Sequence, residues 1–333
     1  MNMEMERRSF FTLLSCAAAS AALPLVARAQ QQPMPVVGYL TGARTVATQH
    51  FVAAFRDGLA DAGFIEGKNV AIEYRFSDGL LERLPAMALD LVRRQVAVIF
   101  AAGGDVPILV AKGATATIPI VFITGYDPVK NGLVASLNRP GGNLTGMTLI
   151  AGQLGAKRLE ILRELVPKTA LIAMLVYPNN PNAEPDTADL QAAARTVGQQ
   201  VHVLNASNAE EIDAAFVTLT QLRAGALMVN PDPFFLGRRA QIVALAARHA
   251  VPTLYYAREY PDSGGLISYG ANFATAYRQA GNYVGRILKG AKPADLPVQA
   301  PVRYETVLNL KTAKTLGIDV PTSVLLRATE VIE

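Results

Sequence analysis

The feature that most constrains the fold is an alternation of short β-branched runs with longer amphipathic segments, which starts near residue 36. Each apolar run is followed by a stretch whose apolar residues recur at helical spacing. Phe51, Phe55 and Leu59 show this spacing within the helix predicted from Thr48 to Ala62. Strands that alternate with helices in this way predict a parallel, doubly wound α/β sheet.

The alternation runs through two successive sets of similar size, which predicts two similar lobes with a junction near residue 148. The strand-forming runs of the first set are VVGYL, VAIEYRF, VAVIFAAGG and IPIVFIT. Those of the second set are LIAMLVY, VHVLNAS, ALMVN and VPTLYY. The last third is less regular and contains GGLISYG, a helix predicted from Phe273 to Leu288, the Pro- and Gly-rich GAKPADLP, and YETVLNL. Periodicity alone assigns none of these late segments to a lobe.

Length and charge narrow the classes of function. A chain of 333 residues that is 51% hydrophobic can bury the cores of about two domains. The formal net charge is +4, and basic residues alternate with acidic ones along the chain. No basic block or basic stripe interleaved with aromatic residues is present, so we predict no nucleic-acid partner.

The first residues have the pattern of an export signal, which we place at 1–29. Arg7 and Arg8 precede an apolar run, and Ala27-Arg28-Ala29 forms a small-x-small cleavage site. The sequence RRSFF is also similar to a twin-arginine signal. A membrane anchor is the less favoured interpretation, because the apolar run is shorter than the ~20 residues that span a bilayer.

The chain contains a single cysteine, Cys16, which lies inside the predicted signal. A lipoprotein anchored at Cys16 is less favoured, because the apolar run continues past it and a better cleavage site follows. Cleavage near Gln30 would leave a mature chain without a thiol. Such a chain has no disulfide, no cysteine nucleophile and no cysteine metal ligand.

The predicted strand ends supply a candidate binding site, because ligands of open parallel sheets collect at the carboxyl ends of the strands. These residues mix hydroxyls, amides, glycines and aromatic rings, which suits a small polar molecule with an apolar part. The candidates in the first lobe are Thr41, Gly42, Phe76, Ser77, Gly103, Gly104, Thr124 and Asp127. Those in the second lobe are Tyr177, Asn180, Asn205, Asp232, Phe234 and Tyr256.

Each candidate also has a structural interpretation. The glycine pair can simply release the chain into the next helix, Asp127 and Asp232 can be turn or helix-cap residues, and the aromatic residues can belong to the core edge. No His-x-x-x-His spacing, clustered acidic set or Gly-x-Ser-x-Gly elbow is present. We therefore expect no enzyme activity, no metal and no cofactor. A catalytic alternative would need Asp127 or Asp232 as general base.

The stretch NRPGGNLTGMT, from Asn138 to Thr148, has the glycine spacing of a phosphate-binding loop. Met147 stands at the lysine position of such a loop, and an extended segment follows where a helix is required. We interpret the stretch instead as the approach to the first crossing between lobes. Gly141 and Gly142 are then expected to take positive φ.

Longer motifs carry a resemblance to a known family. They include GLADAGFIEGKNVAIEYRFSDG, IPIVFITGYDPVKNGLVASLNRPGGNLTGMT, YPNNPNAE and LNLKTAKTLGI. From Val36 to Glu333 the chain resembles the substrate-binding component of bacterial ABC importers. Within them, it is similar to the branch of type I periplasmic binding proteins that includes tryptophan-binding members.

The resemblance implies two Rossmann-like lobes joined by a three-segment hinge that close over a ligand. It assigns 34–148 plus about 271–292 to the N-terminal lobe and 149–270 plus about 293–333 to the C-terminal lobe. A periplasmic monomer that serves an ABC permease of the inner membrane is implied, with an amino-acid-like or aromatic organic acid as ligand. An exported sensor domain that feeds a signalling partner is the alternative.

Two departures from the family pattern fall at candidate positions. Phe76 stands where relatives often have tryptophan, and Tyr177 stands where they often have asparagine. The ligand of a relative, tryptophan included, is therefore not carried over from the resemblance.

Overall fold

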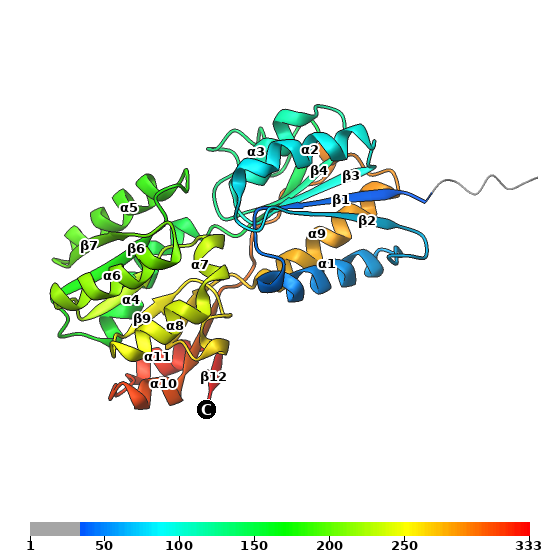
Figure 1. The fold of residues 1–333 in the computed structure, drawn as a ribbon. Helices are drawn as coiled ribbons and strands as arrows, with labels where there is room; N and C mark the ends of the chain where they lie inside the picture. Colours follow the sequence, from blue (N-terminus) through cyan, green and yellow to red (C-terminus); the bar gives the residue numbers. More distant parts are fainter. Residues whose placement is uncertain (1–33) are drawn as a thin grey trace, which may run out of the picture. The chain divides into compact units, whose positions relative to one another are not determined.

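The fold is carried by two sheets whose strands are mainly parallel (Figure 1). The computed structural model describes residues 34–333, so the predicted export signal and Cys16 lie outside the described residues. The sheets belong to two α/β lobes, and this confirms the predicted doubly wound architecture. No helix of the described residues is long and apolar enough to cross a membrane.

The first sheet has five parallel strands in the order β2-β1-β3-β4-β5. Its strands are β1 (Val36–Thr41), β2 (Ala71–Phe76), β3 (Val98–Ala102), β4 (Ile120–Thr124) and β5 (Leu144–Thr148). One face is covered by α1 (Gln49–Asp61) and α9 (Phe273–Leu288), and the other by α2 (Leu84–Arg93) and α3 (Asp105–Ala114) (Figure 1).

The second sheet has seven strands in the order β12-β11-β10-β9-β8-β6-β7. Only the β10–β11 pair is antiparallel. The strands are β6 (Leu171–Val176), β7 (Gln200–Asn205), β8 (Ala226–Val229), β9 (Thr253–Tyr255), β10 (Ile267–Gly270), β11 (Glu305–Asn309) and β12 (Glu330–Ile332).

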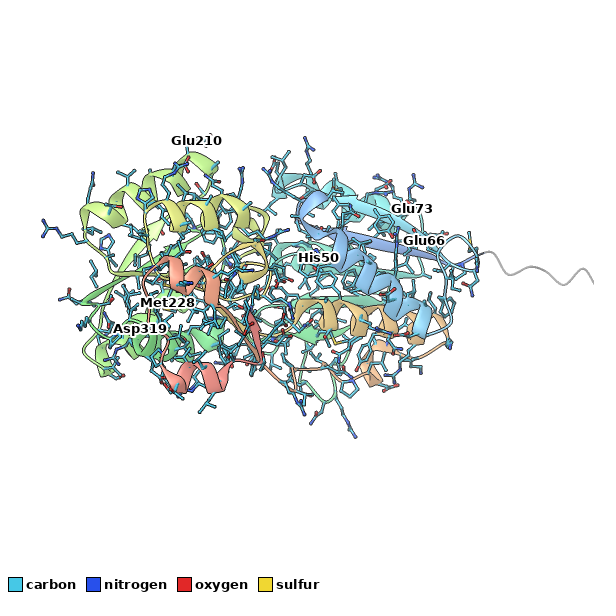
Figure 2. The ribbon with its side chains drawn as sticks, turned by 90° about the horizontal axis from the view of Figure 1, so that it is seen from below. His50, Glu66, Glu73, Glu210, Met228 and Asp319 are labelled. Atoms are coloured by element: carbon cyan, nitrogen blue, oxygen red, sulfur yellow. The ribbon has the colours of Figure 1, made fainter. Side chains whose placement is uncertain are left out.

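Helices cover both faces of this sheet as well. On one side lie α6 (Ala209–Gln221) and α8 (Arg239–Arg248). On the other side lie α4 (Gly155–Leu165), α5 (Ala183–Thr196), α10 (Leu310–Thr315) and α11 (Thr322–Arg327). The short helix α7 (Pro233–Gly237) follows β8 directly. Figure 2 shows the labelled Met228 of β8 within this lobe, where its side chain is buried between strand and helices.

The chain passes between the sheets three times. The first crossing follows β5, the second lies between β10 and α9, and the third precedes β11. Before the third crossing the chain stays beside β5 through Gln299, whose N–H donates to the Gly146 carbonyl oxygen at 3.0 Å. It therefore leaves the first sheet later than the boundary near 292 that the resemblance suggested. The hydroxyl of Thr145 fixes the same segment by donating to the Leu296 carbonyl oxygen at 2.6 Å.

The glycine-rich approach to β5 behaves as the sequence predicts. Gly141 has φ +68° and Gly142 has φ +71°, a conformation that favours glycine. The residues that follow form a complete strand, β5, paired with β4. Because a strand rather than a helix follows these glycines, the segment does not have the architecture of a phosphate-binding loop.

The α1–α9 contact depends on two helical glycines at the point where the backbones meet. A Cβ added at Gly281 would lie 2.0 Å from the Phe55 carbonyl oxygen, and one added at Gly58 would lie 1.7 Å from that of Arg278. Such a backbone approach leaves no room for a methyl group. The late helix α9 thus packs on α1, close to the start of the described residues.

We predict that Gly281→Ala lowers the free energy of unfolding by about 1–3 kcal/mol, the usual cost of overpacking. Gly113→Ala is the matched control, because Gly113 lies in α3 and a Cβ there meets no atom within 4 Å. The control should raise stability by up to about 1 kcal/mol through helix propensity. Urea unfolding measures both, and equal effects of the two changes would contradict the close-contact argument.

Candidate functional site

A pocket of about 1290 Å³, counting the part open to solvent, lies where the carboxyl ends of strands from both lobes meet. Its lining from the first lobe follows β1, β3 and β4 and includes Gly42, Gly104 and Tyr126. Its lining from the second lobe follows β6, β8 and β9 and includes Tyr177, Asp232 and Tyr256. This is the position at which open α/β sheets bind ligands.

The first lobe contributes a bare backbone surface at Gly103 and Gly104. Gly103 has φ +77° and Gly104 has φ +103°, and a Cβ on Gly103 would lie 2.4 Å from the Thr41 hydroxyl oxygen. The helix α3 begins at Asp105 without a side-chain cap. The positive end of a ten-residue helix therefore faces this side of the pocket, which favours a negatively charged ligand group there.

Asp105 is a buried carboxylate that is shared between the lobes. Its Oδ1 accepts a hydrogen bond from the Thr124 hydroxyl at 2.7 Å. Its Oδ2 accepts from Asn131 Nδ2 at 3.2 Å and from Asn182 Nδ2, in the second lobe, at 3.0 Å. Burial raises the pKa of Asp105, and these three hydrogen bonds oppose the rise.

Asp232 is the corresponding buried carboxylate of the second lobe. Its Oδ1 caps α7 by accepting from the Phe234 N–H at 2.7 Å, and its Oδ2 accepts from Asn180 Nδ2 at 2.8 Å. Burial raises the pKa of Asp232 to about 7, although both hydrogen bonds lower it. The charge of Asp105 adds to the rise. A carboxyl that titrates near neutral pH therefore lines the pocket.

Tyr126 joins the pocket to the second lobe. Its ring lines the pocket, and its hydroxyl donates to Asp186 Oδ2 at 3.1 Å. The same hydroxyl oxygen accepts from Asn180 Nδ2 at 3.2 Å. Burial raises the pKa of the Tyr126 hydroxyl, so the tyrosine is neutral and is able to donate.

The remaining walls are largely aromatic. Tyr177 and Phe234 stack with ring centroids 4.9 Å apart, and Phe51 and Tyr277 stack at 4.7 Å. Arg44 is the only arginine or lysine among the residues of the described chain that line the pocket. The pocket thus combines flat apolar walls, buried carboxylates and one cationic side chain, which suits a small zwitterion with an apolar body.

The structure places part of the predicted site in this pocket. The predicted residues that line it are Gly42, Gly103, Gly104, Tyr177, Asn180, Asp232, Phe234 and Tyr256. The predicted residues that are not part of its lining are Thr41, Phe76, Ser77, Thr124, Asp127 and Asn205.

Several residues of the second group support the pocket from behind. Thr41 Oγ1 accepts a hydrogen bond from the Ala43 N–H at 3.2 Å. The Ser77 hydroxyl donates to the Gly42 carbonyl oxygen at 3.4 Å. Thr124 orients Asp105 through the bond described above. These buried hydroxyls hold the loops rather than a ligand.

The other three lie away from the pocket for identifiable reasons. Phe76 ends β2, an edge strand, and stacks on Tyr39 at 5.7 Å. Asp127 closes its own turn, since its Oδ1 accepts from the N–H groups of Val129 and Lys130. Asn205 ends β7, an edge strand of the second sheet, and its side chain is exposed there.

Sequence reasoning missed Arg44, Asp105, Tyr126 and the α9 residues Phe273 and Tyr277. Asp105 follows the glycine pair directly, so the strand-end rule extended by one residue would have included it. Tyr126 lies two residues after the end of β4, so the same rule reaches it as well. No local signal points to Tyr277, because only the second crossing brings α9 to the pocket.

The histidines do not form a metal site. Among the described residues, no group of three or more His, Cys, Asp or Glu side chains is placed to hold a metal ion. His50, labelled in Figure 2, is the second residue of α1. Its Nε2 lies 3.4 Å from Oε1 of Glu259, in the second lobe. His249 Nδ1 lies 2.9 Å from the Thr220 hydroxyl.

Fold and site together define a two-lobed α/β ligand-binding protein. The model of the family of ABC transporter substrate binding proteins matches residues 44–332, and the chain belongs to that family. The family consists of binding proteins rather than enzymes; they act outside the cytoplasm and deliver small-molecule ligands to ABC permeases.

Individual relatives agree with this assignment. A tyrosine-binding protein of Clostridioides difficile (strain R20291) is 25% identical over 264 residues, which are 79% of this chain and 75% of that protein. A conserved domain protein from Vibrio cholerae has a TM-score of 0.81 at 26% identity, and the match covers 90% of this chain and 99% of that one. An ABC domain from Streptococcus pneumonia in complex with L-Trp has a TM-score of 0.80 at 26% identity with the same coverage.

The raised pKa of Asp232 predicts a pH dependence of stability. Its pKa of about 7 in the folded protein exceeds the ~3.9 of an unfolded aspartate. Between these values the folded protein holds a proton that the unfolded chain lacks, so the free energy of unfolding falls as the pH rises from about 4 to about 7. Asp186, whose pKa burial raises to about 6, contributes with the same sign.

Asp232→Asn should therefore reduce this slope, and urea unfolding at several pH values measures it. Carbon-detected NMR of the carboxyl groups should find one aspartate that titrates near pH 7 and is absent in the variant. An Asp232 carboxyl that titrates in the ordinary aspartate range would contradict the prediction.

Proposed function

We propose that this protein is the receptor of an ABC importer for an α-amino acid with a flat, apolar side chain, most simply an aromatic amino acid. The observation that carries the proposal is the pairing of buried carboxylates with aromatic walls in one interlobe pocket. In the proposal the lobes close over the ligand, and the closed form is the one that the permease recognises.

The carboxylates support an ammonium group on the ligand. Asp105 and Asp232 are both buried and line the pocket, and Arg44 is the single arginine or lysine in the lining of the described residues. A buried carboxylate without a cation is costly, and a bound ammonium offsets that cost. Neutral sugars offer no such charge.

The backbone of the first lobe supports a carboxylate on the ligand. The glycine pair at 103–104 and the uncapped start of α3 line the pocket, where the first N–H groups of a helix have no partner within it, and Arg44 lies on the same lobe. Helix N-termini and guanidinium groups are the common partners of carboxylates. An α-amino acid carries both charges at the spacing of one carbon atom.

The aromatic walls support a flat side chain. The Tyr177–Phe234 and Phe51–Tyr277 stacks are separate apolar surfaces, and an offset or edge contact between aromatic rings adds about 0.5–1.5 kcal/mol beyond burial. The names of the relatives, a tyrosine-binding protein and a domain crystallised with L-Trp, are consistent with this class of ligand. Tyr177, where relatives often have asparagine, is part of this wall.

The cellular setting belongs to the same proposal. We place the mature protein in the periplasm, as a monomer beside an inner-membrane permease, after export through the signal at 1–29 by the twin-arginine route. Family membership supports the permease and the extracytoplasmic location. Export of a reporter fused to this signal, with Arg7 and Arg8 both changed to lysine as control, tests the route.

We predict saturable binding of at least one of L-tryptophan, L-tyrosine and L-phenylalanine to the purified protein. The chain contains no tryptophan, so indole fluorescence on addition of L-tryptophan comes from the ligand alone. Isothermal titration calorimetry measures the other two. Binding of a sugar or nucleoside with no binding of any aromatic amino acid would contradict the proposal.

Asp232→Asn should weaken that binding about 10- to 100-fold, because a hydrogen bond to a charged group contributes roughly 1.5–3 kcal/mol. Asparagine keeps the shape and, through its oxygen, the helix cap, but it removes the charge and the oxygen that accepts from Asn180 Nδ2. Asn205→Ala is the matched control, because Asn205 also ends a strand of the second lobe but lies outside the pocket, and its affinity should equal that of the wild type. Equal affinities of all three proteins would exclude a role of Asp232 in ammonium recognition.

Ligand binding should also release protons near pH 7. A cation beside Asp232 favours the charged carboxylate and lowers its pKa from about 7, so a fraction of a proton leaves on binding. Affinity then rises as the pH increases through this range. Calorimetry in two buffers of different ionisation enthalpy measures the release, which Asp232→Asn should abolish. Proton uptake on binding would contradict the assignment.

A further inference from the structure

A second, smaller cavity lies behind the ligand pocket, at the first crossing between lobes. Its lining includes the polar side chains Arg158, Asp186 and Asn230 together with Gly152 and Gly155. Neither Arg158 nor Asp186 is part of the lining of the ligand pocket. Buried Arg158 and half-buried Asp186 therefore have a role other than direct contact with the ligand.

Arg158 holds two of the connecting segments. Its side chain is buried, at 2% exposed, on α4. Nη1 donates to the carbonyl oxygen of Ala151, in the first crossing, at 2.8 Å. Nε donates to the carbonyl oxygen of Tyr269, in the strand that leads into the second crossing, at 2.9 Å. One guanidinium thus fixes the spacing of two hinge segments.

The charge of Arg158 is balanced across this cavity by Asp186. Burial lowers the pKa of Arg158 to about 10, so it stays protonated at neutral pH, and the charge of Asp186 opposes the shift. Nη2 of Arg158 has no hydrogen-bond partner among the described residues. Because a buried charge without its counter-charge is strongly destabilising, the charge of Asp186 in the same cavity favours the charged form of Arg158.

Asp186 also connects the two lobes. It lies on α5 of the second lobe, and its Oδ2 accepts from the Tyr126 hydroxyl of the first lobe at 3.1 Å. Asn230 Nδ2, from its own lobe, donates to the same oxygen at 3.2 Å. Tyr126 in turn accepts from Asn180, which donates to the ligand-pocket carboxylate Asp232. A continuous set of hydrogen bonds therefore leads from the pocket to the hinge.

Gly152 leaves the space in which this bond forms. A Cβ at Gly152 would lie 2.6 Å from Asp186 Oδ1 and 2.8 Å from Cε1 of Tyr126. Three residues along, a Cβ at Gly155 would make only an ordinary contact, at 3.7 Å from Leu190 Cδ1. A side chain at position 152 would thus collide with Tyr126 and Asp186, whereas one at position 155 would not.

We propose that the Tyr126–Asp186 hydrogen bond is an interlobe latch, and that Asp186 is a positioning residue that sets ligand affinity through the balance of open and closed lobes. Arg158 bonds to both hinge segments beside the same cavity, and Gly152 gives the latch its space. The effect on ligand affinity rests on the proposed function, whereas the effect on lobe separation does not. A ligand that favours the closed state is bound less tightly when that state is less populated.

The first test measures lobe separation without ligand. In a Cys16→Ser background of the full chain, Leu89→Cys on α2 and Val217→Cys on α6 carry spin labels, one on each lobe. Both native side chains are about half exposed, at 49% and 51%. Tyr126→Phe and Asp186→Asn should each shift the distance distribution toward longer values. Tyr126→Phe leaves the acid beside Arg158 in place, so a shift there is not a consequence of an uncompensated charge.

Asp189→Asn is the matched control, because Asp189 lies on the same helix with its side chain exposed. Its distribution should equal that of the unmodified protein. Gly152→Ala should reproduce the latch variants without removing either polar group, and Gly155→Ala should not. If Tyr126→Phe, Asp186→Asn and Gly152→Ala all match these controls, the latch does not exist, whatever the ligand is.

The second test measures ligand affinity with an aromatic amino acid. Each latch variant should weaken binding about 5- to 10-fold, the usual scale of one hydrogen bond. The double variant Tyr126→Phe/Asp186→Asn should lose less affinity than the sum of the two single losses, because both changes remove the Tyr126–Asp186 bond. Additive losses would overturn the direct coupling. Longer distances together with no binding of any aromatic amino acid would support the latch and refute the proposed ligand.

Discussion

The burial of carboxylates between two lobes is the constraint on which the rest of the structure depends. Asp105 and Asp232 are buried and Asp186 is half-buried, and desolvation raises the pKa of each one. Asparagine side chains from the neighbouring strand ends donate to all three. Amide donors satisfy oxygen lone pairs without supplying positive charge. In the proposed function a ligand ammonium supplies the positive charge that the pocket carboxylates lack, whereas Arg158 supplies it beside Asp186 at the hinge.

Backbone geometry makes this arrangement accessible. Glycines stand where the chain must approach other backbone or leave room for a polar pair, as at Gly103 in the pocket, Gly152 in the hinge and Gly281 between α1 and α9. The site is thus built from rigid strand ends and helix starts, and the crossings that join the lobes run directly behind it. A receptor that reports occupancy through lobe separation needs this proximity of pocket and hinge.

Much of the architecture could be predicted from the sequence, because strand and helix periods are local properties. Tyr177, Asn180, Asp232 and Tyr256, which the strand-end rule selected, follow strands inside the second sheet and line the pocket. Phe76 and Asn205, which the same rule selected, end β2 and β7 and are not part of the lining. Both are edge strands, whose ends lie away from the pocket. The periodicity of a single segment does not show where its strand will stand in the sheet. Asp127 shows the other failure, since a short polar residue after a strand can as easily close its own turn.

The sequence by itself determined the alternation of strands and helices, the two-set organisation, the positive-φ glycines at 141 and 142, and the polar character of the strand ends. The tertiary structure alone decided which strand ends face each other and that Phe273 and Tyr277 complete the pocket. It also decided that Tyr126 meets Asp186, 60 residues further along the chain. The physical reason is that periodicity and turn chemistry act over a few neighbouring residues. Strand order and interlobe hydrogen bonds depend instead on how distant segments bury their surfaces together.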